Sequence, residues 1–134
     1  MKIFFFCLAA LVIAGGTAWL RTRSRTHMMR VLQQREALDD NLIYSRFYLA
    51  SGIEKASVQE LWHEVANTLK IPAELLRPTD RFGKEIGVSL ITSEELDYLG
   101  ELALKRAKAD GRSIDLKSIR SVDDYVRALG HTHS

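Results

Sequence analysis

Four acidic side chains are gathered on one predicted helix, directly after a loop that contains Gly83 and Gly87. These residues are Glu94, Glu95, Asp97 and Glu101. Negative charge is favourable in the first turns of a helix, and an exposed acidic face can steer a basic patch of a partner protein toward it. An ordinary capped and solvated helix has the same composition, so both interpretations stay open. If the chain has a chemical site, we expect it where this loop meets this helix.

The other polar residues form no pattern that is typical of catalysis. The sequence contains no phosphate-binding loop, no dinucleotide fingerprint, no nucleophile elbow and no evident pair of catalytic carboxylates. His131 and His133 lie close together in the tail, but no cysteine or suitably spaced acidic residue accompanies them as a metal ligand. After residue 50 there is no basic patch with interleaved aromatic residues. We therefore expect a protein that is not an enzyme and that binds neither a metal nor nucleic acid.

Helices must position the acidic face, and their signals follow one another along residues 51–130. Thr92 and Glu95 have capping-box spacing, and the helix after them ends at Gly111. Its apolar stripe consists of Leu96, Leu99, Leu102 or Ala103, and Ala107. The apolar spacing predicts a second helix from Val58 to about Lys70, opened by a Ser57–Glu60 capping box.

A short turn and a last helix complete the predicted domain. Residues 113–119 are too few for a full helix and predict one irregular turn that buries Ile114 and either Leu116 or Ile119. Ser121 is the expected N-cap of a helix from Val122 to Leu129, and residues 131–134 form a tail. No strand-like alternation is present. The fold class we predict is a small all-α bundle of three main helices and one short turn.

The N-terminus has the composition of a membrane segment. Ile3 to Leu20 is a run of 18 residues without charge, which as a helix spans about 27 Å, close to the roughly 30 Å hydrocarbon core of a bilayer. Arginines follow at once, so the positive-inside rule predicts a single-pass anchor (residues 1–20) in the inner, cytoplasmic membrane, with the C-terminal domain in the cytoplasm. The alternative is a signal peptide cleaved near Gly16–Ala18, which would yield an exported helical binding protein.

Residues 21–50 form a basic juxtamembrane segment without proline or glycine. Residues 1–50 carry seven Lys/Arg against three Asp/Glu, whereas residues 51–134 carry twelve against fourteen. We expect Arg21, Arg23 and Arg25 to contact anionic headgroups. An approximate heptad of Met28, Val31, Leu38, Leu42 and Leu49 predicts a stalk helix. Its apolar edge would either fold back on the domain or form a self-associating coiled coil, and hence a homo-oligomer.

The order of these elements from Val58 to Leu129 resembles the acyl carrier protein family. Three short segments carry the resemblance: Leu69-Lys-Ile-Pro-Ala-Glu-Leu-Leu, Phe82-Gly-Lys-Glu-Ile-Gly and Ser121-Val-Asp-Asp-Tyr-Val. They are similar to the end of the family's first helix, the loop before its modified serine and the start of its last helix. The resemblance implies a long first helix, a wandering loop, an acidic second helix that docks partners, a short third turn and a closing helix.

The resemblance also implies a modification site. The family carries 4′-phosphopantetheine on the serine of an Asp-Ser-Leu motif, and Gly87-Val88-Ser89-Leu90 offers Ser89 and Leu90, with Val88 in the place of the aspartate. A serine here would otherwise only solvate the turn. We therefore expect a membrane-anchored, acyl-carrier-like protein that serves as a docking module or a divergent carrier. The alternative is a functional carrier with 4′-phosphopantetheine on Ser89.

Overall fold

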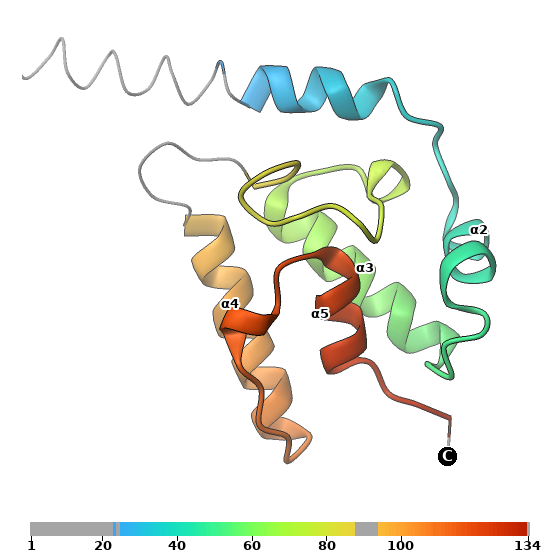
Figure 1. The fold of residues 1–134 in the computed structure, drawn as a ribbon, viewed down its shortest axis with the longest axis vertical. Coiled ribbons are helices and arrows are strands. Elements are labelled where there is room, and N and C mark those ends of the chain that lie inside the picture. Colours follow the sequence, from blue (N-terminus) through green and yellow to red (C-terminus); the bar gives the residue numbers. More distant parts are fainter. Residues whose placement is uncertain (1–22, 24, 88–93, 134) are drawn as a thin grey trace, which may run out of the picture.

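The computed structural model describes residues 23, 25–87 and 94–133, and this part of the chain is built from helices joined by loops (Figure 1). In these residues the only extended pairings are isolated bridges, such as those of Ile53 with Thr132 and of Arg81 with Ser121. The all-α prediction is therefore confirmed. None of the helices in the described ranges has the length and apolar character needed to cross a bilayer. The predicted anchor and Arg21 lie outside these ranges.

Three amphipathic helices form the centre of the bundle: α3 (Lys55–Leu69), α4 (Glu94–Ala109) and α5 (Val122–Leu129). Short 3₁₀ helices, η2 (Ala73–Leu75) and η3 (Leu116–Ser118), interrupt the connecting loops. Along α4 the expected stripe is confirmed, because Leu99, Ala103 and Ala107 are buried and Leu96 packs partly against the same core. The side chains of α3 and α5 meet this stripe, so the bundle buries one continuous hydrophobic core.

The two predicted N-caps that can be compared with the structure have opposite outcomes. Ser121 caps α5 as expected: its hydroxyl accepts from the Asp124 amide, and the Asp124 carboxylate accepts from the Ser121 amide. The Ser57 box is wrong, because α3 begins at Lys55, three residues before the predicted start at Val58, with Glu54 as an N-cap that makes no side-chain capping bond. The Ser57 hydroxyl instead accepts from the amide of His131 in the tail, at 2.9 Å.

The segment before α3 departs from the predicted stalk. A helix over residues 25–33 (the N-terminal helix) ends in an irregular stretch at 34–39, followed by α2 (Asp40–Ile43) and η1, a π-helix from Tyr44 to Tyr48. A single helix through this region is therefore wrong, and the heptad holds only at Met28 and Leu38, because the break changes which of the later side chains face inward. The buried side chains are Met28, Leu32, Leu38, Ile43 and Tyr48, whereas Val31, Leu42 and Leu49 are exposed. These buried side chains join the core of the bundle.

A buried ion pair fixes this segment to the rest of the bundle. Both terminal nitrogens of Arg35 donate to the carboxylate of Asp80, each at 2.7 Å, and Asp80 is only 1% exposed. Arg35 also donates to the carbonyl of Leu75, and the amide of Arg77 donates to Asp80 at 2.9 Å. The bond to Asp80 raises the pKa of Arg35 above its ordinary value. The N-terminal helix and the loop of residues 71–87 are thus held together on one side of α3 (Figure 1).

Candidate functional site

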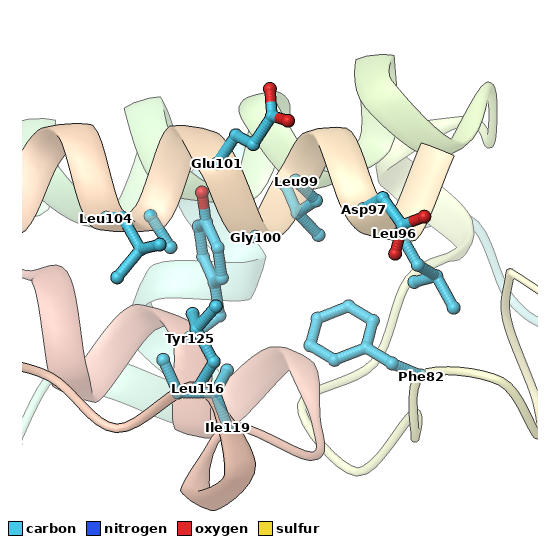
Figure 2. A pocket seen from close by; sticks show the side chains of 11 residues that line it. Phe82, Leu96, Asp97, Leu99, Gly100, Glu101, Leu104, Leu116, Ile119 and Tyr125 are labelled. Atoms are coloured by element: carbon cyan, nitrogen blue, oxygen red, sulfur yellow. The ribbon is translucent and has the colours of Figure 1, made fainter. Parts of the chain in front are cut away.

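An apolar groove of about 300 Å³ lies between α4 on one side and η3 and α5 on the other; we call it the α4 groove (Figure 2). Its lining residues are Phe82, Leu96, Asp97, Leu99, Gly100, Glu101, Ala103, Leu104, Leu116, Ile119 and Tyr125. Apart from two acidic side chains and one tyrosine, all of these are apolar or glycine. The volume is at the lower end of the range of pockets that hold small ligands or large side chains.

The helical period of α4 builds one wall of the groove, and three other segments build the opposite wall. Leu96, Gly100 and Leu104 follow one another at spacings of four along the helix and so lie on one side of it. Figure 2 shows Phe82, Leu116 and Ile119 across from them. Gly100 adds no side chain to the space between the walls; a methyl group at this position would make ordinary van der Waals contact with the Cδ1 atom of Leu116, at 3.5 Å.

Tyr125 contributes an apolar ring to the groove, while its hydroxyl is occupied elsewhere. The hydroxyl donates to Glu64 Oε2 at 2.6 Å, and the same carboxylate accepts from Arg106 Nε at 2.8 Å. Burial, and secondly the bond to Glu64, raises the pKa of Tyr125 well above its ordinary range. The phenol therefore stays protonated at physiological pH, and it serves the groove as a packing surface.

The two carboxylates at the rim carry unbalanced negative charge. Asp97 and Glu101 are exposed, and neither forms an ion pair with any residue in the described part of the chain. The other two predicted partner-binding residues do not line the groove, although Glu94 lies three residues before Asp97 on the same face of α4. Glu95 is half-buried. The predicted acidic face thus divides into a rim pair and two residues at the start of the helix.

Some predicted site residues lie elsewhere or outside the described ranges. Ser89 lies outside them, as does Thr92 of the predicted capping box. Arg23 is exposed, and so is Arg25 at the start of the N-terminal helix, where its Nη2 atom donates to the carbonyl of Lys70 at 3.1 Å. His131 lies 2.9 Å from Asp110. No group of three or more possible metal ligands occurs among the residues that the structure describes.

Sequence reasoning missed most of the apolar lining. The predicted turn buries Ile114 and either Leu116 or Ile119. In the structure Ile114 and Ile119 are both partly buried, and Leu116 is 39% exposed at the groove. Leu104 is 46% exposed and lies off the predicted stripe of α4. The signal that could have found the site is a pair of unusual residues on one helix face: a large apolar Leu104 on the solvent side, and Gly100 four residues before it.

The lining of the α4 groove is suited to binding an apolar group. In the groove as described, the titratable side chains are Asp97, Glu101 and Tyr125, and none of them contacts another as a nucleophile would contact its base. An apolar group could enter between Phe82, Leu99 and Leu116 and lie beneath two negative charges. No protein-family model, no curated protein and no solved structure matches the chain.

Proposed function

We propose that this protein is a membrane-anchored, acyl-carrier-like docking module whose α4 groove binds a segment of a partner protein. The partner segment presents one large apolar side chain flanked by lysine or arginine. The observation that supports this most directly is the combination of an apolar groove with two rim carboxylates, Asp97 and Glu101, that form no ion pair among the described residues. The proposed role is binding and presentation.

The energetics favour such an occupant. Leu104 and Leu116 are 46% and 39% exposed, and covering apolar surface gains roughly 25 cal/mol for each Å² removed from water. Charges at the rim contribute mainly to the association rate and to selectivity, because they attract a basic partner and repel an acidic one. The groove therefore supplies the affinity, and the carboxylates select the class of partner.

The order of the helices along the chain also supports the acyl-carrier-like part of the proposal. A long α3, an irregular loop, the acidic α4, the short η3 and the closing α5 follow the sequence of elements that the resemblance to acyl carrier proteins implies. The membrane part of the proposal depends on the uncharged run from Ile3 to Leu20 and the arginines after it. In this proposal the docking groove lies in the cytoplasm, beside the inner membrane.

A synthetic peptide tests the groove directly. The probe is a fluorescein-labelled amphipathic helix with leucines on one face and flanking lysines, and fluorescence anisotropy measures its affinity for the full-length protein in nanodiscs. We expect Glu101→Gln to weaken binding several-fold at low salt, and Gly100→Met to weaken it by filling the groove. The matched control is Glu74→Gln, an exposed carboxylate far from the groove. Equal affinities for all four proteins would refute the docking site.

A second function, that of a functional acyl carrier, is favoured by the position of the groove along the chain. Phe82 and Leu96 both line the groove, and Ser89 lies between them in the sequence. In this alternative the Ser89 hydroxyl forms a phosphodiester with the 4′-phosphopantetheine of coenzyme A, releasing adenosine 3′,5′-bisphosphate. The apolar groove would then shelter a short acyl chain.

Intact mass separates the two functions. The protein is co-expressed with a phosphopantetheinyl transferase, and the mass of the purified chain is measured. A mass gain that disappears in Ser89→Ala would establish the carrier, whereas an unmodified chain leaves the docking module as the better account.

A further inference from the structure

We infer that the occupant of the α4 groove is a second copy of this chain, which presents the outward side of α2 and η1. We call this side the η1 face and define it by Leu42, Ser45, Arg46 and Leu49. The inference rests on the proposed function, because it names the partner of the same groove. A contact between a groove on one copy and a different surface on the next is head-to-tail, so it joins copies into a ring or a row.

Exposure along α2 and η1 follows a helical pattern. The exposed residues are 41–42, 45–46 and 49–50, and the residues between these pairs are buried or half-buried. Because the exposed pairs recur every four residues, they lie in one stripe along the outside of the two helices. The η1 face is therefore a single surface that a partner could cover at once.

Two leucines on this face are available to a partner. Leu42 and Leu49 are 41% and 67% exposed and lie seven positions apart, with Arg46 between them. Leucines at this spacing are typical of a helix that binds in an apolar groove. Directly after Leu49, the amide and the hydroxyl of Ser51 both donate to the carbonyl of Tyr48, at 3.0 and 2.6 Å. Leu49 is thus held outward on a fixed turn, so little conformational freedom is lost when another molecule covers it.

Arg46 supplies positive charge at the Leu49 end of the face. Among the ion pairs of the described residues it has one partner, Glu36, at 3.7 Å, and both side chains are exposed. An exposed pair of this kind contributes little to stability, so Arg46 can exchange it for a carboxylate of another copy. Burial and neighbouring arginines, Arg46 among them, lower the pKa of Arg77. Two cations therefore lie near Glu36, and the charge at this end is positive on balance.

The opposite end of the η1 face is acidic, and this decides how the face can dock. Asp39 and Asp40 lie at the start of α2, close to Leu42 in the sequence. Like charges repel, so this end must point away from the carboxylates at the rim of the α4 groove. In the resulting contact Leu49 enters the groove, and Arg46 lies against the acidic rim.

The η1 face and the α4 groove cannot meet within one chain. On the buried side of η1, the Tyr48 ring packs against Trp62 of α3, and its hydroxyl donates to Asp123 of α5 at 3.1 Å. The η1 face therefore points away from the bundle, and Figure 1 shows α2 and α4 on opposite sides of it. The contact gives the expected homo-oligomer a seam other than the heptad of residues 21–50, which the break at 34–39 interrupts.

Cross-linking between two differently tagged copies tests this contact. Both are full-length proteins with Cys7→Ser, which removes the single natural cysteine. One copy carries Ser45→Cys on the η1 face, and the other carries Ser118→Cys in η3, two residues after Leu116; both serines are exposed. The copies are mixed in phosphatidylcholine vesicles and treated with a short bismaleimide. We expect the mixed 45–118 cross-link to form several-fold more than the 45–45 or 118–118 cross-link of either protein alone.

Charge exchange identifies the partners across the contact. Arg46→Glu in the copy with the position-45 cysteine should lower the yield of the mixed cross-link several-fold. Adding Asp97→Lys/Glu101→Lys to the other copy should restore it, because the two charges are then exchanged. The matched control is Lys108→Glu in the first copy, which reverses an exposed charge near the end of α4 and should leave the yield unchanged.

The outcomes separate this inference from the docking function on which it rests. A 45–45 yield equal to that of the mixed cross-link, or a loss that the charge exchange does not restore, would overturn the inference. Binding of the lysine-flanked peptide to the α4 groove without a 45–118 cross-link would also overturn it and would leave the docking function in place. A charge-dependent cross-link without peptide binding would support the inference and remove the foreign partner.

Discussion

Carboxylates lie beside apolar side chains in two regions of this bundle, and the two regions differ in whether the carboxylates are buried and paired. Asp80 is 1% exposed and accepts from both terminal nitrogens of Arg35 and from the amide of Arg77. Asp97 and Glu101 are exposed at the α4 groove and form no ion pair with the described residues. The buried carboxylate holds the chain together, because its charge is balanced within the fold. The exposed pair leaves its charge available to another molecule.

A similar contrast separates the α4 groove from the buried end of α5, where Gly130 follows the helix. A methyl group on Gly130 would lie 2.6 Å from the carbonyl oxygen of Val126 and 2.7 Å from Ile53 Cγ2, so this position has no free space. A methyl group on Gly100 would lie 3.5 Å from its nearest neighbour, which is ordinary van der Waals contact. The interior is filled to the limit, whereas the groove has room for an added group.

The largest effect should come from breaking the buried pair. Arg35→Met keeps much of the aliphatic chain but leaves Asp80 buried without its charged partner, and we expect it to lower the free energy of unfolding by about 3 kcal/mol. Urea denaturation of the full-length protein, followed by circular dichroism, measures the loss. The matched control is Arg81→Met, which removes one partner of the exposed Arg81–Glu85 pair and should change stability far less, because exposed ion pairs contribute little. Similar losses in both variants would remove the distinction.

The next largest effect should come from overfilling the interior. We expect Gly130→Ala to lower the free energy of unfolding by roughly 1–3 kcal/mol, because the new methyl group must displace Ile53 or the last turn of α5. Thermal denaturation measures the change. An unchanged melting temperature would show that this end of the bundle is looser than its contacts suggest.

The corresponding change in the groove should have the opposite sign. Gly100 lies inside α4, where alanine is favoured over glycine by about 0.5–1 kcal/mol, and the added methyl group meets Leu116 without a clash. We therefore expect Gly100→Ala to raise the melting temperature. A loss of stability would mean that the walls of the groove are already in close contact at this point.

The smallest effect should be an acid-dependent one at an exposed pair. The hydrogen bond from the Arg81 guanidinium lowers the pKa of Glu85 to about 2, from an ordinary value of about 4.3. Because the folded-state pKa is the lower one, the contribution is complete above pH ~4.3 and is lost as the pH falls toward 2. Glu85→Gln should make the decline of the melting temperature over this interval slightly shallower. A decline as steep as that of the parent protein would show that the pair contributes nothing.

The sequence predicted the elements whose signals are local. Ser121, Asp124 and the apolar positions of α5 lie within one short stretch, and the helix begins and ends where they indicate. The same reasoning failed at Ser57, because a residue 74 positions away, His131, supplies the amide that bonds to its hydroxyl. Capping patterns of equal quality therefore differ in outcome when a distant segment competes for the side chain.

Features that depend on distant contacts were not predictable from spacing. Arg35 and Asp80 are separated by 45 positions, and neither residue has an unusual neighbourhood in the sequence. The predicted heptad assumed one unbroken helix, but the helix breaks at residues 34–39. Two of its positions, Met28 and Leu38, are buried, whereas Val31, Leu42 and Leu49 are exposed. For the groove, the sequence placed Asp97 and Glu101 on an exposed acidic face, but it could not bring Phe82 and Leu116 beside them. Tertiary packing decides all of these positions.

A charge-swap measurement tests the docking groove most directly. Anisotropy is recorded for the full-length protein and for Asp97→Lys/Glu101→Lys, each with a leucine-faced helical peptide flanked by lysines and with the same peptide flanked by glutamates. The account predicts that the parent protein prefers the lysine peptide, that the double variant prefers the glutamate peptide, and that Gly100→Met weakens both interactions. If the preference does not reverse, or if filling the groove has no effect, the α4 groove is not the docking site.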